Sequence, residues 1–356
     1  MEFAVCMMSD VDEIGFFNHA ENLGYDAVWI TDSQMMMSDC YAVMALAAQQ
    51  TKTIKIGTGT SVCGNRIPPA HVAAAATANR IAPGRIFLGF GTGNTAMRTM
   101  SQPPMKIKDY HEFIRVLSAL LRGEVVDYTY EGRTYPIKML VHEEKYMNLE
   151  PKIPLYVSGF GPKAMAVAGE FGDGLVFAIP PRGTPVKEAM ANAKVGADRA
   201  GRSMAGFRNA ALINIAMLEQ GEEVNSDRII EAIGPNVMAS VYYFYNFTKE
   251  RQADPPDFLK DIWKGYLELI SDTPPEHRHF RTQEYHYWKL HPGEAELLKA
   301  APQLIRDTCM VGRPEELVEQ IRQLEADGLQ HIMWATGNEA KWRFAEEFSR
   351  KVMARL

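Results

Sequence analysis

Glycines close two apolar runs in the first hundred residues, and this pattern is the feature of the chain most suited to binding a ligand. The first run contains Ile56-Gly57-Thr58-Gly59 and continues to Ser61-Val62, and the second ends in Gly89-Phe90-Gly91-Thr92-Gly93. Apolar runs without polar alternation are typical of strands that are buried on both faces, as in parallel sheets covered by helices. Small residues at the carboxyl ends of such strands let a flat ligand approach the backbone closely. The sequence therefore predicts a cofactor seat at these strand ends.

Two of these features admit another interpretation. The segment from Gly89 to Gly93 nearly matches a dinucleotide fingerprint, but Asn94 follows it and the acidic ribose partner of that fingerprint is missing, which disfavours NAD. Asp32 follows a third apolar run directly, where it suits either a helix cap or a catalytic acid at a strand end.

Cationic and aromatic side chains offer further candidates. Arg98 and Arg182 follow predicted strands, where an acidic substrate group could be met, but a solvated loop residue is the favoured interpretation for Arg182. The aromatic run from 242 to 247 suits core packing, a subunit contact or a substrate wall equally. Four histidines lie close together in sequence without acidic or thiolate partners at ligand spacing, so we expect no metal: His277, His279, His286 and His291.

Short apolar runs alternate with amphipathic segments along most of the chain. The predicted strands are Phe3–Met8, Tyr25–Thr31, Ile54–Thr60, Arg85–Gly91, Leu155–Ser158, Gly174–Ala178, Ala210–Met217 and Gln330–Ala335. The predicted helices are Val11–Leu23, Tyr41–Thr51, Ala70–Ile81, Lys108–Leu121, Pro162–Phe171, Val186–Ala200, Pro314–Asp327 and Glu339–Ala354. Eight strands, each followed by helical sequence, predict an α/β fold of the (β/α)8 TIM-barrel type.

Two stretches break this repeat. Residues 124–151 contain a predicted β-hairpin, and residues 234–302 form a long excursion rich in Tyr, Phe, His and Pro. A long excursion in a compact domain is usually a lid or a binding loop, and a subunit contact is the alternative here. With no flexible linker between the halves, the sequence predicts a single domain over 1–356 with two insertions.

Composition excludes several classes of function. The net charge of −6 and the lack of any Lys/Arg-rich block argue against a nucleic-acid surface. The four cysteines show no CxxC spacing, the N-terminus enters a strand at once without a signal peptide, and no apolar run is long enough to span a membrane. We therefore expect a cytoplasmic protein.

Several blocks occur together in a specific order and spacing: Ala27-Val28-Trp29-Ile30-Thr31-Asp32, Ile56-Gly57-Thr58-Gly59, Pro83-Gly84-Arg85-Ile86-Phe87-Leu88-Gly89-Phe90-Gly91-Thr92-Gly93, Val157-Ser158-Gly159-Phe160-Gly161-Pro162-Lys163-Ala164, Gly172-Asp173-Gly174 and Val311-Gly312-Arg313-Pro314-Glu315-Glu316. With them the chain resembles the luciferase-like flavin oxidoreductase superfamily over nearly its whole length, apart from the aromatic insertion. The branch that it resembles most contains methylenetetrahydromethanopterin reductase and other deazaflavin-dependent enzymes. The superfamily also holds monooxygenases that use reduced FMN.

The resemblance implies a role for particular positions. Ser61 and Val62 match a bulge that often holds a non-prolyl cis peptide behind the flavin-like ring. Gly91, Thr92 and Gly93, followed by Asn94, match the loop that passes along the cofactor. Ser158, Gly159, Phe160 and Gly161 precede a helix whose free N–H groups suit the cofactor's phosphate, although a plain capped loop is the alternative. Asp32 matches an acid near the edge of the ring.

Two departures from the pattern of the deazaflavin branch narrow the range of reactions that the chain could catalyse. Alcohol and sugar-phosphate dehydrogenases of the deazaflavin branch have a histidine after that Asp and a glutamate after Gly-Thr-Gly, where this chain has Ser33 and Asn94. Alcohol oxidation needs a base, and neither replacement titrates. Asp32, Ser33 and Asn94 are therefore the predicted catalytic residues of a different reaction.

Three hypotheses follow from the sequence. The leading one is a monooxygenase that receives reduced FMN from a separate flavin reductase and acts on a small organic substrate. The alternative is a reductase dependent on deazaflavin coenzyme F420, which transfers hydride to an activated double bond. The third is a flavin-binding protein without turnover. Family habit adds the expectation of a homodimer or homotetramer.

Overall fold

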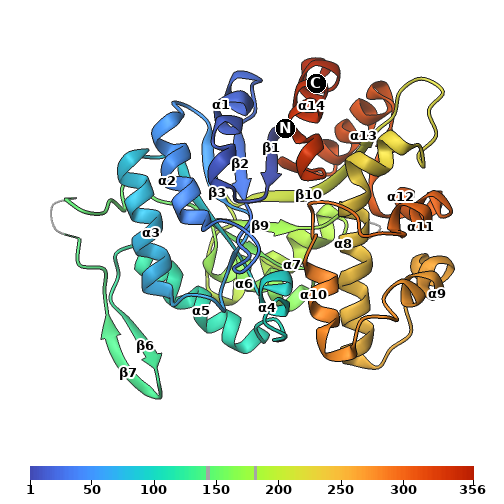
Figure 1. The fold of residues 1–356 in the computed structure, drawn as a ribbon. Coiled ribbons are helices and arrows are strands. Elements are labelled where there is room, and N and C mark those ends of the chain that lie inside the picture. Colours follow the sequence, from blue (N-terminus) through green and yellow to red (C-terminus); the bar gives the residue numbers. More distant parts are fainter. Residues whose placement is uncertain (142–144, 180–182) are drawn as a thin grey trace.

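The predicted TIM barrel is confirmed by the computed structural model, which describes residues 1–141, 145–179 and 183–356. Among these residues, eight parallel strands pair side by side at the centre of the molecule (Figure 1). The pairing of β12 with β1 closes the ring. In ring order they are β1 (Glu2–Met7), β2 (Ala27–Ile30), β3 (Lys55–Thr58), β5 (Ile86–Gly91), β8 (Leu155–Ser158), β9 (Gly174–Phe177), β10 (Arg208–Met217) and β12 (His331–Ala335). Each end lies within two residues of the prediction because these strands are buried on both faces.

Helices surround the strands as Figure 1 shows. They are α1 (Gly15–Asn22), α2 (Cys40–Gln50), α3 (Pro68–Ile81), α5 (Ile107–Leu121), α6 (Pro162–Phe171), α7 (Val186–Arg199), α13 (Pro314–Ala326) and α14 (Lys341–Lys351). Local sequence explains where several of them start. Asp39 caps α2 by accepting hydrogen bonds from the N–H groups of Tyr41 and Ala42, and a proline opens α3, α6 and α13.

The interior of the barrel is filled by aromatic side chains that need glycine opposite them. A Cβ atom on Gly57 would lie 2.1 Å from the ring of Phe87, and one on Gly59 would lie 2.5 Å from Trp29 Cβ. The rings of Trp29 and Phe87 pack edge to face with centroids 4.5 Å apart. These two glycines therefore serve packing inside the barrel.

Two glycines allow α6 and α7 to pack unusually closely. A Cβ on Gly169 would lie 1.8 Å from the carbonyl oxygen of Ala193, and one on Gly196 would lie 1.7 Å from that of Ala166. Replacing Gly196 by alanine should therefore force the helices apart and lower the free energy of unfolding by about 1–3 kcal/mol, measured by urea unfolding.

Gly15→Ala is the matched control, because its Cβ would meet only Trp342, at 3.9 Å. We expect it to leave stability unchanged or slightly improved. Equal losses from the two substitutions would contradict this account of the α6–α7 contact.

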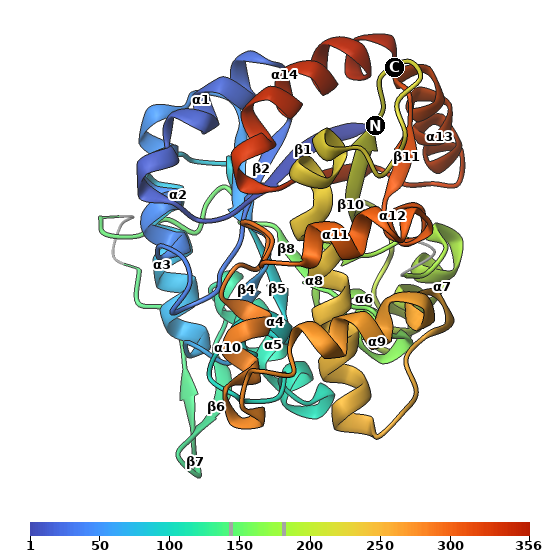
Figure 2. The same ribbon diagram turned by 45° about the vertical axis from the view of Figure 1, so that its right-hand side comes forward.

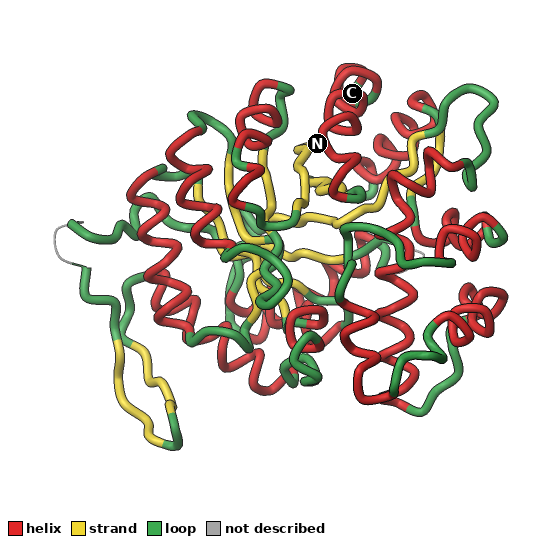
Figure 3. Tube along the Cα trace, viewed as in Figure 1, coloured by secondary structure: helices red, strands yellow, loops and turns green. Residues whose placement is uncertain are grey.

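The two insertions differ in structure. The predicted hairpin is confirmed as β6 (Val126–Tyr130) paired with β7 (Arg133–Ile137), and it projects from the body of the protein (Figure 1). The second insertion is helical (Figure 3), with α8 (Asp227–Arg251), α9 (Lys260–Leu269), α10 (Arg278–Gln283), α11 (Glu294–Lys299) and α12 (Pro302–Thr308). Its first helix begins at Asp227, so the expected start at 234 falls inside α8. Its own core includes Tyr242 and Tyr245.

Three further short strands and helices lie between these elements. They are β4 (Ser61–Val62), which pairs with β5, β11 (Met310–Gly312), which pairs with β10, and α4 (Asn94–Arg98), which follows β5. Within the described residues, no helix is both long enough and apolar enough to cross a membrane.

Candidate cofactor and active site

The strand order brings most of the predicted site residues to one end of the barrel. β2, β3, β5 and β8 are consecutive neighbours, and all run in the same direction. Asp32, Ser61, Gly91 and Ser158 therefore lie at the carboxyl ends of adjacent strands, the face on which TIM-barrel enzymes place their active sites.

Asp32 joins the loop after β2 to the loop after β4. Its carboxylate is buried, and one oxygen, Oδ2, accepts hydrogen bonds from the Val62 N–H at 3.4 Å, Asn65 Nδ2 at 3.2 Å and Arg66 Nη1 at 3.3 Å. Arg66 also pairs with Asp39 at the start of α2. Sequence analysis missed Arg66, which has no local motif and is identified only by its partners. Asp32 is thus an anchor for the backbone around Val62.

Ser33 is buried beside Asp32, and its backbone carbonyl accepts hydrogen bonds from the N–H groups of Met36 and Met37 at 3.3 and 3.2 Å. The next side chain, Gln34, donates from Nε2 to the carbonyl oxygen of Ala96 in α4 at 2.7 Å. The loop after β2 is therefore tied to the loop after β5.

The segment after β5 is shaped by its glycines. Gly93 has a left-handed φ of 86° and leads directly into α4. A Cβ on Gly91 would lie 2.7 Å from Thr60 Oγ1, and one on Gly93 would lie 2.5 Å from Val62 Cγ1. Contacts within the protein thus already require both glycines. The carbonyl of Thr92, between them, accepts a hydrogen bond from the Met105 N–H at 2.9 Å.

Asn94 is held in place by Arg98. Its Oδ1 accepts a hydrogen bond from Arg98 Nε at 2.9 Å, and the guanidinium of Arg98 forms a bidentate pair with Glu250 at the end of α8. The Arg98 side chain is therefore engaged with a carboxylate of the protein itself. Arg182, the other candidate for an acidic substrate group, lies outside the described residues.

The non-prolyl cis peptide implied by the resemblance is present, but it lies two residues before the expected position. It joins Gly59 and Thr60, so the position expected at Ser61-Val62 was wrong. Ser61 and Val62 instead form β4, where they pair with Phe90 and Gly91.

A buried hydrogen-bond chain lies behind β4. Ser61 Oγ donates to Tyr41 Oη at 3.2 Å, and Tyr41 Oη lies 2.8 Å from His71 Nδ1. Burial lowers the pKa of His71 to about 3, so its ring is neutral at physiological pH. This chain fixes the Ser61 side chain, and its members share no sequence motif.

The segment from Ser158 to Gly161 leaves a helix start open. Ser158 ends β8, the Gly159 N–H donates to the Val176 carbonyl at 2.9 Å, and Gly161 stands immediately before α6 without a side-chain cap. A Cβ on Gly161 would meet no atom within 4 Å, so space exists beside the first turn of α6. Uncapped N–H groups next to open space suit an anionic group such as a phosphate.

Phe160 links this segment to the helical insertion. Its side chain is 62% exposed, and its ring centroid lies 6.4 Å from that of Tyr243 in α8. The aromatic run thus divides: Tyr242 and Tyr245 pack in the core of the insertion, whereas Tyr243 faces the predicted cofactor loop.

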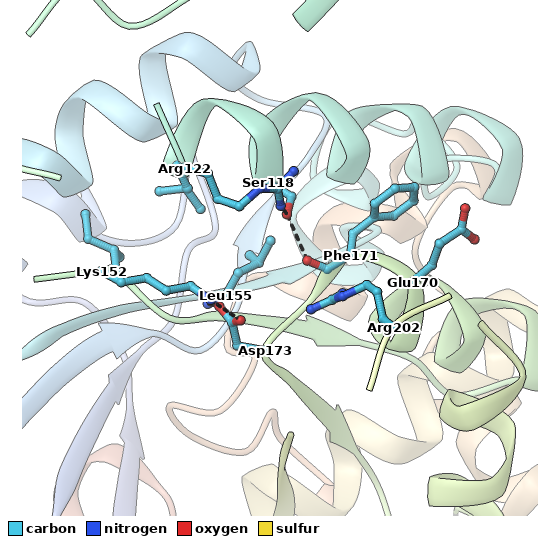
Figure 4. A pocket seen from close by; sticks show the side chains of 10 residues that line it. Ser118, Arg122, Lys152, Leu155, Glu170, Phe171, Asp173 and Arg202 are labelled. Atoms are coloured by element: carbon cyan, nitrogen blue, oxygen red, sulfur yellow. Dashed lines mark hydrogen bonds and ion pairs between the residues drawn. The ribbon is translucent and has the colours of Figure 1, made fainter. Parts of the chain in front are cut away.

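Two cavities lie at the opposite end of the barrel. One, of about 300 Å³, is lined by charged residues of the α5, α6 and β8 region (Figure 4). Its charges have partners within the protein: Lys152 pairs with Asp173, Arg122 with Glu124, and Arg202 donates to the carbonyls of Gly169 and Gly172. The other, of about 80 Å³, lies over Trp29 and Phe87. Residues at this face of a TIM barrel usually contribute to stability and not to catalysis. In the described part of the chain, no three His, Cys, Asp or Glu side chains gather as a metal site would require.

Comparison with known proteins agrees with this architecture. A family model described as luciferase-like monooxygenase matches residues 11–331. The 5,10-methylenetetrahydromethanopterin reductase of Archaeoglobus fulgidus is 25% identical over 325 residues, which is 88% of this chain and 86% of that protein. An F420-dependent glucose-6-phosphate dehydrogenase of Microbacterium testaceum is 32% identical over 170 residues, covering 44% of this chain and about half (49%) of the relative.

A solved structure gives the same fold. The coenzyme F420-dependent tetrahydromethanopterin reductase of Methanopyrus kandleri superimposes with a TM-score of 0.71 and 20% identity, covering 99% of each chain. With the family model matching most of its length, this chain belongs to the luciferase-like family of oxidoreductases.

Proposed function

We propose that this protein is a reductase that uses deazaflavin coenzyme F420 and transfers hydride to an activated double bond. The observation that carries the proposal is the similarity to the Archaeoglobus fulgidus reductase, which extends over 88% of this chain. The sequence alone placed an FMN-dependent monooxygenase first and this reductase second, and the named relatives favour the second hypothesis.

The residues at the barrel mouth fit such a coenzyme. The open start of α6 at Gly161 would hold its phosphate, and the backbone from Gly91 to Asn94 would run along its ring. Asp32 and Arg98 would keep the neighbouring loops in place. When bound in reduced form, a deazaflavin supplies a hydride, which carries two electrons, to an acceptor carbon.

The side chains at the expected base positions support reduction over alcohol oxidation. Ser33 is buried, and Asn94 is fixed by the guanidinium of Arg98. A hydroxyl and an amide can orient an acceptor by hydrogen bonds, but neither removes a proton from an alcohol at neutral pH. The same two residues are the ones that the sequence predicts to contact the reacting groups.

Coenzyme titration tests the proposal. We expect coenzyme F420 to bind at least about 100-fold more tightly than FMN, a difference of about 2.7 kcal/mol, when each is titrated into the protein and followed by fluorescence. Reduced coenzyme mixed with the protein and an activated alkene should then be oxidised without oxygen.

The competing hypotheses give other results. Preferential binding of reduced FMN, with slower decay of its oxygen adduct than in free solution, would replace the proposal with the monooxygenase, which needs a separate flavin reductase as partner. Binding of either coenzyme without turnover of any acceptor would favour the flavin-binding protein.

A further inference from the structure

The helical insertion carries one residue into the mouth of the barrel. Tyr287, in the turn after α10, packs against the cluster of side chains inside the barrel that includes Cys6, Trp29 and Met333. Its backbone is left-handed, with a φ of 63°. Bulky non-glycine residues adopt this conformation rarely, and such positions concentrate at functional sites. The turn that holds Tyr287 is therefore positioned at the mouth by the fold around it.

The preceding residue, His286, lies beside the predicted cofactor loop. Its Nε2 is 3.1 Å from Thr95 Oγ1, one residue after Asn94, and its ring centroid is 4.7 Å from that of Tyr287. α10, which ends three residues before His286, and α4, which contains Thr95, are in contact and lie side by side in Figure 2. An imidazole from a distant part of the chain thus reaches the neighbour of a residue expected to contact the reacting groups.

One nitrogen of this imidazole lacks a partner. His286 is 8% exposed, and its Nδ1 is buried without a hydrogen bond to any of the described residues. Buried polar atoms nearly always have a partner, so a bound ligand or a water molecule would supply the partner that this nitrogen lacks. Burial lowers the pKa of His286 to about 4, so the ring is uncharged at neutral pH and can donate or accept one hydrogen bond at Nδ1.

Three of the arginines around these loops already have carboxylate partners. Arg98 pairs with Glu250, Arg281 on α10 pairs with the fully buried Glu294, and Arg66 pairs with Asp32 and Asp39. None of these three guanidinium groups is left over to neutralise an anionic substrate. The ammonium of Lys289, in the same turn as His286, stacks over the rings of Tyr285 and Trp288. With these cations engaged inside the protein, the surroundings of His286 suit an uncharged polar group better than a phosphate or a carboxylate.

We propose that His286 binds the hydride acceptor through Nδ1, and that the acceptor presents an uncharged carbonyl or imine conjugated to its double bond. Hydride from the reduced coenzyme would form a C–H bond at the far carbon of that double bond, and a proton from solvent would complete the product at the near carbon. The coenzyme is oxidised by two electrons and the acceptor is reduced by two. This inference rests on the proposed function.

A pair of matched probes tests the acceptor class without turnover. 2-Cyclohexen-1-one is neutral, and 1-cyclohexene-1-carboxylate places an anionic group on the same ring. Binding is followed by NMR of the protein labelled at the histidine ring carbons, with and without oxidised coenzyme F420. We expect the His286 resonance to shift with the enone, and the carboxylate to bind at least about 10-fold more weakly. Stronger binding of the carboxylate, or no binding of the enone in either state, would overturn the proposal.

Three variants test the residue. His286→Phe should weaken enone binding by about 10-fold and lower kcat with reduced coenzyme more than it raises KM, because the hydrogen bond to the reacting carbonyl is lost. His286→Gln, which keeps a hydrogen-bonding group, should restore most of both. His277→Phe is the control, since His277 is exposed in the same insertion. Equal behaviour of the 286 and 277 phenylalanine variants would refute a role for His286.

Coenzyme titration of the same samples distinguishes failure of the acceptor inference from failure of the proposed function. If every variant binds coenzyme F420 as the wild type does while the enone never binds, the proposed function stands and the acceptor inference falls. If the wild type fails to bind the coenzyme, the proposed function falls, whatever the probes show.

Discussion

Replacing Asp32 by alanine should weaken coenzyme binding by about 10- to 100-fold and lower the free energy of unfolding by about 2–4 kcal/mol. Three donors from β4 and the segment after it share one oxygen of this carboxylate: the Val62 N–H, Asn65 and Arg66. The substitution leaves the buried Val62 N–H without this acceptor, while Arg66 keeps Asp39 as a carboxylate partner, so the backbone next to Gly93 loses its anchor. Coenzyme titration and urea unfolding measure the two effects.

Asp39→Ala is the control for this prediction. It removes the other carboxylate partner of Arg66, but Asp39 is half exposed and lies at the start of α2. We expect a loss of about 1 kcal/mol from the helix cap and little change in coenzyme affinity. Equal effects of the two substitutions on affinity would mean that Asp32 acts only through its charge on Arg66.

The helical insertion should become less stable as the pH rises from about 5 to 8. Glu294 is fully buried, and burial raises its pKa from an ordinary value of 4.5 to about 7. The hydrogen bonds from Tyr242 and the contact with Arg281 act on this pKa in the opposite direction but do not cancel the effect of burial. Because the folded state binds this proton more tightly than the unfolded state, the stability is fully present below pH 4.5. It is lost as the pH rises towards 7, by about 3 kcal/mol in total.

Glu294→Gln isolates this titration from the other groups of the protein. The difference in unfolding free energy between pH 5 and pH 8 should shrink by about 2–3 kcal/mol relative to the wild type. Arg281→Met should have the opposite effect: a loss of about 3 kcal/mol at pH 8, where a buried carboxylate is left without its cation, and a much smaller loss at pH 5. A pH dependence that is the same in the wild type and in Glu294→Gln would show that this carboxyl group does not titrate in that range.

The barrel could be predicted closely from sequence because its signals are local. Strands such as β2 and β12 are buried on both faces and read as short apolar runs, and Pro162 and Pro314 mark the starts of their helices. The helices of the second insertion could not be predicted in the same way. Aromatic residues and Pro235 lie inside α8 and obscure its helical periodicity.

The sequence predicted which strand ends form the candidate site, but not the contacts between the side chains there. The ends of β2, β5 and β8 do meet at one face, as the order of strands requires. The contacts that shape this face join residues far apart in sequence, such as Thr95 with His286 and Arg98 with Glu250. The role of a glycine is also set by its neighbours in space: Gly57 admits a phenyl ring, whereas Gly161 faces open space.

A structure of the protein with coenzyme F420 would test the central claim most directly. We predict the ring against the backbone of Gly91 to Asn94, beneath the turn that holds Tyr287, and the phosphate at the N–H groups that follow Gly161. A coenzyme bound instead at the opposite face, in the cavity lined by Arg122 and Lys152, would contradict the assignment of the active site.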